Sequence, residues 1–538
     1  MSDAVTIFDT TLRDGTQGEG ISLTVEDKLK IARKLDELGV HYIEGGWPGS
    51  NNKDIEFFER IRSVKLNHAK ITAFGSTRRK DTRPEQDPNL QAILDSGVKV
   101  ASIFGKSWDF HVHKALQTTL EENLAMIRDS VRYLKSKGLE VIYDAEHFFD
   151  GYKNNADYAM QTILAAEEAG ADWIVLCDTN GGSLPDEVRA IVTEVRARLK
   201  APLGIHAHND CELGVANTLA AVQAGARQVQ GTINGIGERC GNANLSSVIP
   251  NLQLKLGFRC VSDEQLRSLY NAARYISEIA NMHLPVNQPY VGAAAFAHKG
   301  GIHVSAILKH PSTYEHIRPE LVGNKQRVLV SELAGQSNLI FKAQELNLDI
   351  DLETDKARAM IRKIKDMEHQ GYQFEGADAS LELLLREASG DVQTIFTLES
   401  AKIFVEKNGS GRFTTEAILK LNVQGQTLYT AAEGNGPVHA LDNALRQALV
   451  QFYPQIRDMH LTDYKVRVLD GKEATASKVR VLIESSDLHR TWSTVGVSEN
   501  IIEASWEALV DSIRYGLLNR SGDSGREASR ENAGTAGR

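Results

Sequence analysis

Cysteine is scarce in this chain of 538 residues, which contains only four. Cys177, Cys211, Cys240 and Cys260 form no C-x-x-C pair. The chain therefore lacks the sequence signature of a disulfide framework. We expect a protein of the reducing cytoplasm.

Long apolar runs and an excess of positive charge are also missing. No apolar run approaches the roughly 20 residues that a membrane helix needs, and residues 1–4 show neither a basic region nor the apolar core of a signal peptide. The 61 Lys and Arg residues are outnumbered by 71 Asp and Glu residues, for a net charge of −10. This balance disfavours nucleic acid and membrane surfaces as partners.

A repeated join between helix and strand dominates the first half of the chain. An amphipathic helix ends at a glycine, and an apolar strand begins one to three residues later. Glycine after a helix adopts the left-handed conformation that closes the last turn. The join occurs at Gly39, Gly97, Gly138, Gly170 and Gly225.

Three further apolar strands, 5–8, 71–74 and 203–205, bring the number to eight within about the first 235 residues. Eight βα units in about 260 residues predict a (β/α)8 TIM barrel over residues 1–265. An open doubly wound sheet is the alternative.

The rest of the chain predicts two further parts. Residues 266–390 read as a helical connector, with helices at 266–284 and 354–388. Residues 391–520 alternate strands and helices and predict a separate C-terminal α+β domain with two similar halves. Its predicted strands and helices are 393–398, 417–423, 464–468 and 478–483, and 437–453 and 500–518. Residues 521–538 lack large hydrophobic side chains and predict a disordered tail.

Polar residues gather where the predicted barrel strands end, which is where TIM-barrel enzymes place their chemistry. His206 and His208 end strand 7, and residues two apart on a strand face the same side. With Asp14 after strand 1 and Asn242 after strand 8, they predict a metal site of two nitrogens and two oxygens. In the alternative interpretations, the histidines belong to an ordinary polar loop, and Asp14 only orients Arg13 or a helix N-terminus.

Three other residues at these ends predict the chemistry beside the metal. Arg13 can clamp an oxyanion or a carboxylate. Thr179 offers a hydroxyl group to a small carboxylate, and Glu146 can accept or donate a proton, unless it forms a structural salt bridge. The set suits carbon–carbon bond formation between an acyl-CoA and a 2-oxo acid, and it does not exclude the reverse lyase reaction.

Three motifs follow one another along the chain: Asp9-Thr10-Thr11-Leu12-Arg13-Asp14-Gly15, His206-Ala207-His208 and Gly241-Asn242-Ala243-Asn244. In this order they resemble the metal-dependent Claisen-condensing acyltransferases on TIM barrels. This family contains the 2-isopropylmalate, homocitrate and citramalate synthases. Residues 44–51, 103–108 and 143–152 resemble the long-form citramalate synthase branch, whereas 2-isopropylmalate synthases usually differ in the strand 2 and strand 5 motifs.

The resemblance implies a role for each matching residue. Asp14, His206, His208 and Asn242 match metal ligands for zinc, manganese or magnesium, and Glu146 matches the catalytic carboxylate. The keto-acid site matches Arg13, Asp14, Thr179 and, more weakly, Asp144. In the connector, His303 and Tyr314 match catalytic residues contributed by the partner subunit, and His298 competes with His303 for the histidine role. Residues 391–520 resemble the family's amino-acid-binding regulatory domain, and Gly434, Gly436 and Pro437 match its effector-binding turn.

The implied reaction joins acetyl-CoA, pyruvate and water into (R)-citramalate and CoA. This reaction opens a threonine-independent isoleucine pathway, with isoleucine as feedback inhibitor and a homodimer as the assembly. Alternatives are 2-isopropylmalate synthesis from 2-oxoisovalerate, a hydroxyacyl-CoA lyase, and an inactive amino-acid sensor.

Overall fold

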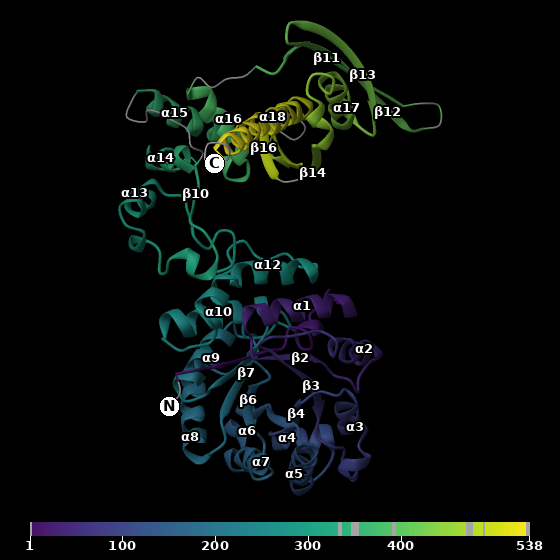
Figure 1. Ribbon diagram of the computed structural model, residues 1–538, viewed down its shortest axis with the longest axis vertical. Coiled ribbons are helices and arrows are strands. Elements are labelled where there is room, and N and C mark those ends of the chain that lie inside the picture. Colours follow the sequence, from purple (N-terminus) through teal and green to yellow (C-terminus); the bar gives the residue numbers. More distant parts are fainter. Residues whose placement is uncertain are drawn as a thin grey trace. The chain divides into compact units, whose positions relative to one another are not determined.

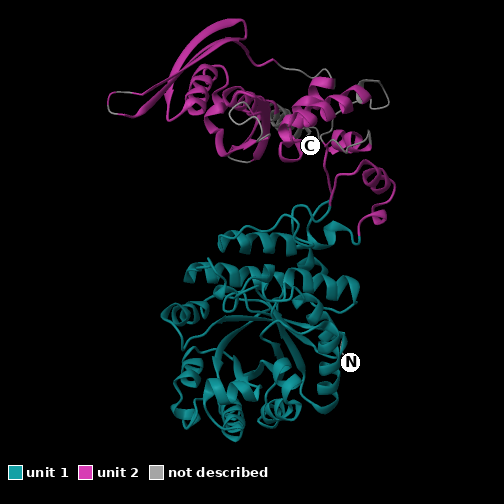
Figure 2. Cartoon of the chain, turned by 180° about the vertical axis from the view of Figure 1, so that it is seen from behind, with its two compact units in different colours: residues 1–296, 316–326 teal, residues 297–315, 327–538 magenta. Residues whose placement is uncertain are grey.

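The computed structural model describes residues 3–331, 336–345, 355–389, 394–407, 409, 411–469, 477–487 and 490–533. The chain forms two compact units, Met1–Phe296 with His316–Gln326, and Ala297–Glu315 with Arg327–Arg538 (Figure 2). The predicted boundaries at 265, 390 and 520 stay a prediction. The predicted tail also stays a prediction: α18 (Ile501–Ala533) is helical as far as Ala533, and residues 534–538 lie outside the described part.

The first unit is a closed barrel of eight parallel strands in sequential order, which confirms the predicted TIM barrel. The barrel closes where β1 pairs with β8, from Thr6 opposite Gln228 to Asp9 opposite Gly231. The open-sheet alternative is therefore wrong. The strands are β1 Thr6–Asp9, β2 Tyr42–Gly46, β3 Lys70–Ser76, β4 Val100–Lys106, β5 Glu140–Glu146, β6 Trp173–Asp178, β7 Leu203–Ala207 and β8 Gln228–Gly231.

Helices surround this barrel (Figure 1), and the five predicted glycine joins all have positive φ angles, between 73° and 120°. Side chains other than glycine rarely adopt this conformation, which explains why the repeat uses glycine. The helices around the barrel are α1 Val25–Leu38, α2 Asn52–Ile61, α3 Pro88–Asp95, α4 Asp109–His111, α5 Leu120–Ser136, α6 Phe148–Asn154, α7 Ala156–Glu168, α8 Pro185–Arg198, α9 Gly214–Gln223 and α10 Leu245–Pro250. α11 (Asp263–Arg267) and α12 (Leu269–Ile279) follow, where one helix was predicted.

The barrel interior changes from apolar to polar along the strands. Its apolar layer contains Tyr42, Val100 and Ile142, which are buried together with Phe8, Val175 and Cys177. Because side chains alternate along a strand, the next inward residues are two positions further on. They are Glu44, Ser102 and Asp144, all buried. Burying such groups costs free energy unless they are hydrogen-bonded or paired, so this polar layer marks the site.

The second unit begins with a small helical part. β9 (Ala297–His298) pairs in parallel with β10 (Arg327–Val328). The helices are α13 Gly301–Lys309, α14 Gln336–Glu345, α15 Asp355–Gln370 and α16 Asp378–Ser389. The last two match the predicted charged helices on either side of residues 369–372.

Two three-stranded antiparallel sheets complete the second unit, each followed by one helix. The first has β11 Thr397–Lys407, β12 Phe413–Val423 and β13 Gln426–Gly434, and leads into α17 Pro437–Leu449. The second has β14 His460–Val468, β15 Val479–Ser486 and β16 Thr491–Ser498, and leads into α18. The two similar halves were predicted, but β13 and β16 were missed and the predicted strand at 393–398 begins only at Thr397; residues 390–393 lie outside the described part.

In the part of the chain that the structure describes, no helix has both the length and the apolar character needed to cross a membrane.

Candidate active site and metal centre

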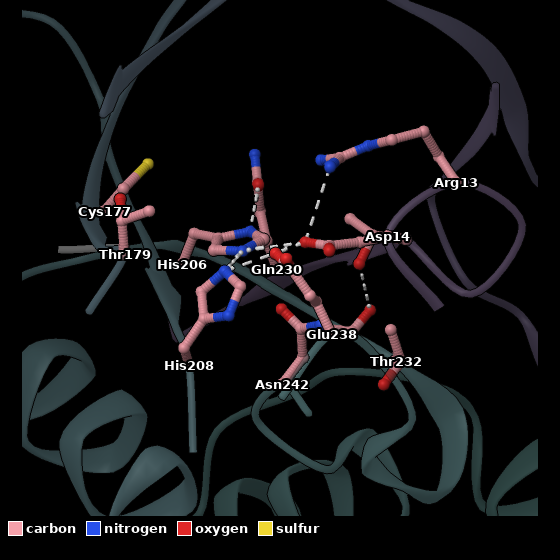
Figure 3. A network of polar contacts seen from close by, with 12 residues as sticks. Arg13, Asp14, Cys177, Thr179, His206, His208, Gln230, Thr232, Glu238 and Asn242 are labelled. Carbon is pink, nitrogen blue, oxygen red and sulfur yellow. Dashed lines mark hydrogen bonds and ion pairs between the residues drawn. The ribbon is translucent and has the colours of Figure 1, made fainter. Parts of the chain in front are cut away.

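Asp14, His206 and His208 meet at the carboxyl ends of the barrel strands (Figure 3). One carboxylate oxygen of Asp14 lies 3.2 Å from Nε2 of His206 and 3.9 Å from Nε2 of His208. The two Nε2 atoms are 3.3 Å apart. All three residues are buried. Three potential ligand atoms thus converge on one point, as the sequence predicted.

Backbone pairing places the fourth predicted ligand beside them. β7 ends at Ala207, so His208 lies just beyond the strand, where it forms an isolated bridge with Asn242. On either side of this bridge, the amide of Asn209 donates to the Gly241 carbonyl at 2.9 Å and the amide of Ala243 to the Ala207 carbonyl at 2.8 Å. The loop after β8 is therefore held against the end of β7.

The Asn242 side chain carries an acceptor that suggests a ligand. Asn242 is 1% exposed, and within the described residues its Oδ1 atom has no hydrogen-bond partner. An unpartnered buried carbonyl oxygen costs roughly 1–3 kcal/mol, and a metal bond would remove this cost. Two imidazoles, one carboxylate and one amide oxygen suit a divalent cation with positions left open for a substrate. The residues present therefore fit a metal.

A second layer orients His206. Its Nδ1 lies 2.9 Å from Oε1 of Gln230, whose Nε2 donates to Asp144 at 3.0 Å. The Ser102 hydroxyl donates to the other oxygen of Asp144 at 2.6 Å. The Gln230 oxygen accepts a hydrogen bond from Nδ1 of His206, which would leave Nε2 as the nitrogen that binds an ion.

Arg13 is fixed between an acid and an aromatic ring. Its Nε donates to Glu44 at 2.6 Å, and Nη1 lies 3.5 Å from Asp14. The guanidinium carbon lies 3.7 Å from the centre of the Phe74 ring. Asp14 therefore contacts both Arg13 and the histidines, so the alternative in which it only orients Arg13 is incomplete.

The acids around Arg13 have shifted pKa values. Burial raises the pKa of Glu44 to about 7, against the charge of Arg13, which lowers it. Burial also raises the pKa of Asp144, against its hydrogen bond from Ser102. For Asp14, burial acts upward, but the charge of Arg13 and the hydrogen bond with His206 outweigh it and hold its pKa well below the usual range. Asp14 is thus the permanent anion of the site.

The pKa values of the two histidines are shifted in opposite directions. Burial lowers the pKa of His208 to about 3, and the nearby charge of His206 adds to this effect. Burial also acts to lower the pKa of His206, but the hydrogen bond and charge of Asp14 raise it overall. A neutral imidazole is the form that binds a metal.

Glu146 and Thr179 lie at the ends of β5 and β6. Glu146 forms an ion pair with Lys106, the structural alternative raised from the sequence, and its catalytic role stays a prediction. The Thr179 hydroxyl accepts a hydrogen bond from the amide of His147 at 2.9 Å. Its own hydrogen therefore remains available to a carboxylate.

The predicted connector and effector residues belong to the second unit. His303 stacks on Tyr314, with 4.2 Å between ring centres, whereas His298 lies 3.3 Å from Glu315. Gly434 ends β13, and Pro437 begins α17 after Gly436. Their predicted roles stay predictions.

Sequence reasoning assigned no role to Glu44, Ser102, Gln230 or Arg239. The first three are polar residues within barrel strands, at positions that face inward by alternation. That pattern was visible in the sequence and could have identified them. Arg239 follows β8, and its contacts arise only from the fold.

Family comparisons cover most of the chain. The family described as HMGL-like matches residues 4–276. The homocitrate synthase post-HMGL domain-like family matches residues 290–372, and the LeuA allosteric (dimerisation) domain matches residues 375–517.

Curated relatives align over nearly the full length. The (R)-citramalate synthase of Geobacter sulfurreducens is 57% identical over 95% of this chain and 97% of its own. That of Aquifex aeolicus is 55% identical over 96% of this chain and 98% of its own. The 2-isopropylmalate synthase of Methanocaldococcus jannaschii is 32% identical over 96% of both chains. The chain therefore belongs to the citramalate synthase family of HMGL-like condensing enzymes, which are acyltransferases.

Proposed function

We propose that the enzyme condenses acetyl-CoA with pyruvate and water to give (R)-citramalate and CoA. One observation carries the proposal: ligand atoms of Asp14, His206 and His208 converge beside the unpartnered oxygen of Asn242, in a chain 57% identical to an (R)-citramalate synthase. The reaction opens a route to isoleucine.

Asp14, His206, His208 and Asn242 hold a divalent cation in this proposal. The bound ion would polarise the carbonyl group of the 2-oxo acid. Arg13 points its guanidinium at the same region in one orientation, because Glu44 holds Nε and Phe74 covers one face. Such a fixed fork suits the developing negative charge on the keto oxygen.

Glu146 acts on a proton of acetyl-CoA, and Thr179 binds the carboxylate of the 2-oxo acid. Glu146 removes a proton from the acetyl methyl group, and its ion pair with Lys106 holds the carboxylate in position. The methyl carbon then bonds to the keto carbon, whose oxygen takes up a proton. Water cleaves the thioester, which releases CoA and a carboxylate. The Thr179 hydroxyl donates to the carboxylate of the 2-oxo acid.

Three aromatic side chains support pyruvate as the 2-oxo acid. Phe74 and Phe104 stack with 5.4 Å between ring centres, and Trp47 packs edge-on against both. Phe104 shares the inward face of β4 with Ser102, and Phe74 contacts Arg13. This aromatic wall leaves less room for the isopropyl group of 2-oxoisovalerate than for the methyl group of pyruvate.

The proposal is tested by incubating the enzyme with acetyl-CoA, Mn²⁺ and each of a panel of 2-oxo acids. Release of CoA measures the rate, and chiral analysis identifies the product. Pyruvate should give the highest kcat/KM and (R)-citramalate. Faster turnover of 2-oxoisovalerate would contradict the proposal in favour of 2-isopropylmalate synthesis.

Phe104→Ala should shift the preference toward the larger substrate. The variant opens space in the aromatic wall, and one or two carbon atoms in a pocket change discrimination by roughly 10–200-fold. We expect the kcat/KM ratio of 2-oxoisovalerate to pyruvate to rise by about tenfold or more. Phe104→Leu is the control, since it keeps most of the apolar volume and should change the ratio less. An unchanged ratio in Phe104→Ala would exclude Phe104 from the acceptor pocket.

The proposed enzyme is a dimer that isoleucine inhibits, and the first C-terminal sheet supports the dimer. In the first sheet, the side chains of β12 alternate between α17 and the opposite face. Phe404 lies opposite Glu416 and Tyr429 opposite Lys420, all on the face away from α17. Phe404 is 52% and Tyr429 70% exposed. A second copy would cover these rings, and a single-chain mass in light scattering would contradict the dimer.

Gly436→Ala tests the effector site. Gly436 has extended backbone (φ −172°), and among the described residues nothing lies within 4 Å of an added Cβ, so alanine fits. The methyl group would occupy space at the start of α17 that the effector is proposed to use. We expect the isoleucine inhibition constant to rise about tenfold, or ~1.4 kcal/mol. Inhibition equal to that of the wild type would exclude this turn, and a wild-type enzyme insensitive to isoleucine would exclude the effector.

A further inference from the structure

Arg239, in the loop between β8 and α10, joins three parts of the barrel rim. Its Nε donates to Oδ1 of Asp210 at 2.8 Å, and Nη2 donates to Oδ2 at 2.9 Å. The same Nη2 donates to the Thr179 carbonyl oxygen at 2.7 Å and lies 3.2 Å from Nδ1 of His208. One guanidinium nitrogen therefore faces three acceptors.

This contact conflicts with metal binding by His208. A guanidinium group has only donors, so Nδ1 of His208 must accept, and the ring hydrogen then lies on Nε2. However, Nε2 is the atom that faces Asp14 and His206 in the metal site. A metal binds through the lone pair of Nε2. In a metal-bound histidine the other ring nitrogen carries the hydrogen and donates a hydrogen bond. His206 already meets this condition through Gln230, and His208 does not.

We propose that Arg239 is a positioning residue that controls metal loading by occupying Nδ1 of His208. A divalent cation binds Nε2 only after the guanidinium has moved away from Nδ1. The ring hydrogen of His208 then moves from Nε2 to Nδ1, and the Thr179 carbonyl, which shared Nη2 with the ring, becomes a free acceptor next to it. The inference rests on the metal site of the proposed function, but not on which 2-oxo acid is used.

The surroundings of Arg239 allow this movement. Its side chain is 39% exposed. It lines a pocket of about 330 Å³ together with Ile276, Met282 and Leu284. The backbone of Arg239 has φ 55°, in the left-handed region that an arginine rarely adopts. Space for the guanidinium lies next to its present position.

Calorimetric titration with Mn²⁺ tests the proposal on the full chain. Arg239→Ala removes the competing donor and should bind Mn²⁺ about tenfold more tightly than the wild type. Arg239→Lys keeps the charge but cannot reproduce the fork on Asp210, so it should also bind more tightly. Arg60→Ala is the matched control: Arg60 is also exposed and paired with an acid, Glu26, at 2.6 Å. It should leave the affinity unchanged.

Each other outcome overturns the proposal. Equal or weaker binding by Arg239→Ala would show that Arg239 does not compete with the ion. Wild-type affinity in Arg239→Lys beside tighter binding in Arg239→Ala would mean that only the charge matters. Absence of Mn²⁺ binding in every variant would remove the metal site and this inference together, whereas unchanged affinities would remove the inference alone.

A crystal structure of the wild-type enzyme with Mn²⁺ gives a test without any substitution. The ion should lie on Nε2 of His208 with the guanidinium displaced from Nδ1. An ion on Nε2 with Arg239 still within hydrogen-bond distance of Nδ1 would overturn the proposal.

Discussion

His208→Ala should lose its bound divalent metal and reduce kcat by ~10³-fold, since metal polarisation contributes several kcal/mol to such reactions. The variant removes one of the three converging ligand atoms and leaves Asp14, His206 and the Asn242 oxygen to hold the ion. Metal content by elemental analysis and kcat with pyruvate are the two measurements. Both should fall together.

The fold should survive this change, because His208 lies beyond the end of β7 and its bridge to Asn242 is formed by the backbone, which alanine keeps. Circular dichroism and the thermal midpoint should therefore remain close to those of the wild type. His113→Ala is the control, since His113 is an exposed histidine of the same unit. Full activity of His208→Ala without metal would contradict the metal-dependent reaction.

Arg13→Ala should lose activity and also destabilise the barrel. Glu44 is completely buried, and Arg13 is its ion-pair partner at 2.6 Å. Removing one partner of a buried pair leaves an uncompensated charge and costs about 3–5 kcal/mol. The free energy of unfolding, measured by chemical denaturation, should fall by that amount.

The loss of stability in Arg13→Ala should grow as the pH rises. Burial already raises the pKa of Glu44 from 4.5 to about 7 in the presence of Arg13, which acts to lower it. Without Arg13 the pKa of folded Glu44 rises further, so the folded protein binds the proton more tightly than the unfolded chain. Stability of the variant should therefore fall as the pH rises from about 4.5 through 7.

The double variant Arg13→Ala with Glu44→Gln separates stability from catalysis. Glutamine carries no charge, so most of the lost stability should return, whereas activity should not. A double variant as unstable as Arg13→Ala would mean that the buried charge of Glu44 is not the cause.

The barrel was predictable because its signals are local. A glycine at the end of a helix, as at Gly39 or Gly170, depends on the backbone of a few neighbouring residues. The C-terminal sheets were predicted less well for the opposite reason. β13 has exposed or half-exposed side chains along its length and little apolar alternation. Its pairing with β12 identifies it as a strand, and that pairing is visible only in three dimensions.

The sequence by itself determined the barrel, and it predicted Asp14, His206, His208 and Asn242 as metal ligands at the strand ends. Closure of the barrel then decided which side chains meet. Gln230 and Asp144 are 86 positions apart and Arg239 and His208 are 31 apart, yet each pair is in contact. Short-range rules of turns and alternation give the direction of a side chain along its own strand. The packing of distant strands alone decides its partners, and here it assigns Gln230 to His206 and Arg239 to His208.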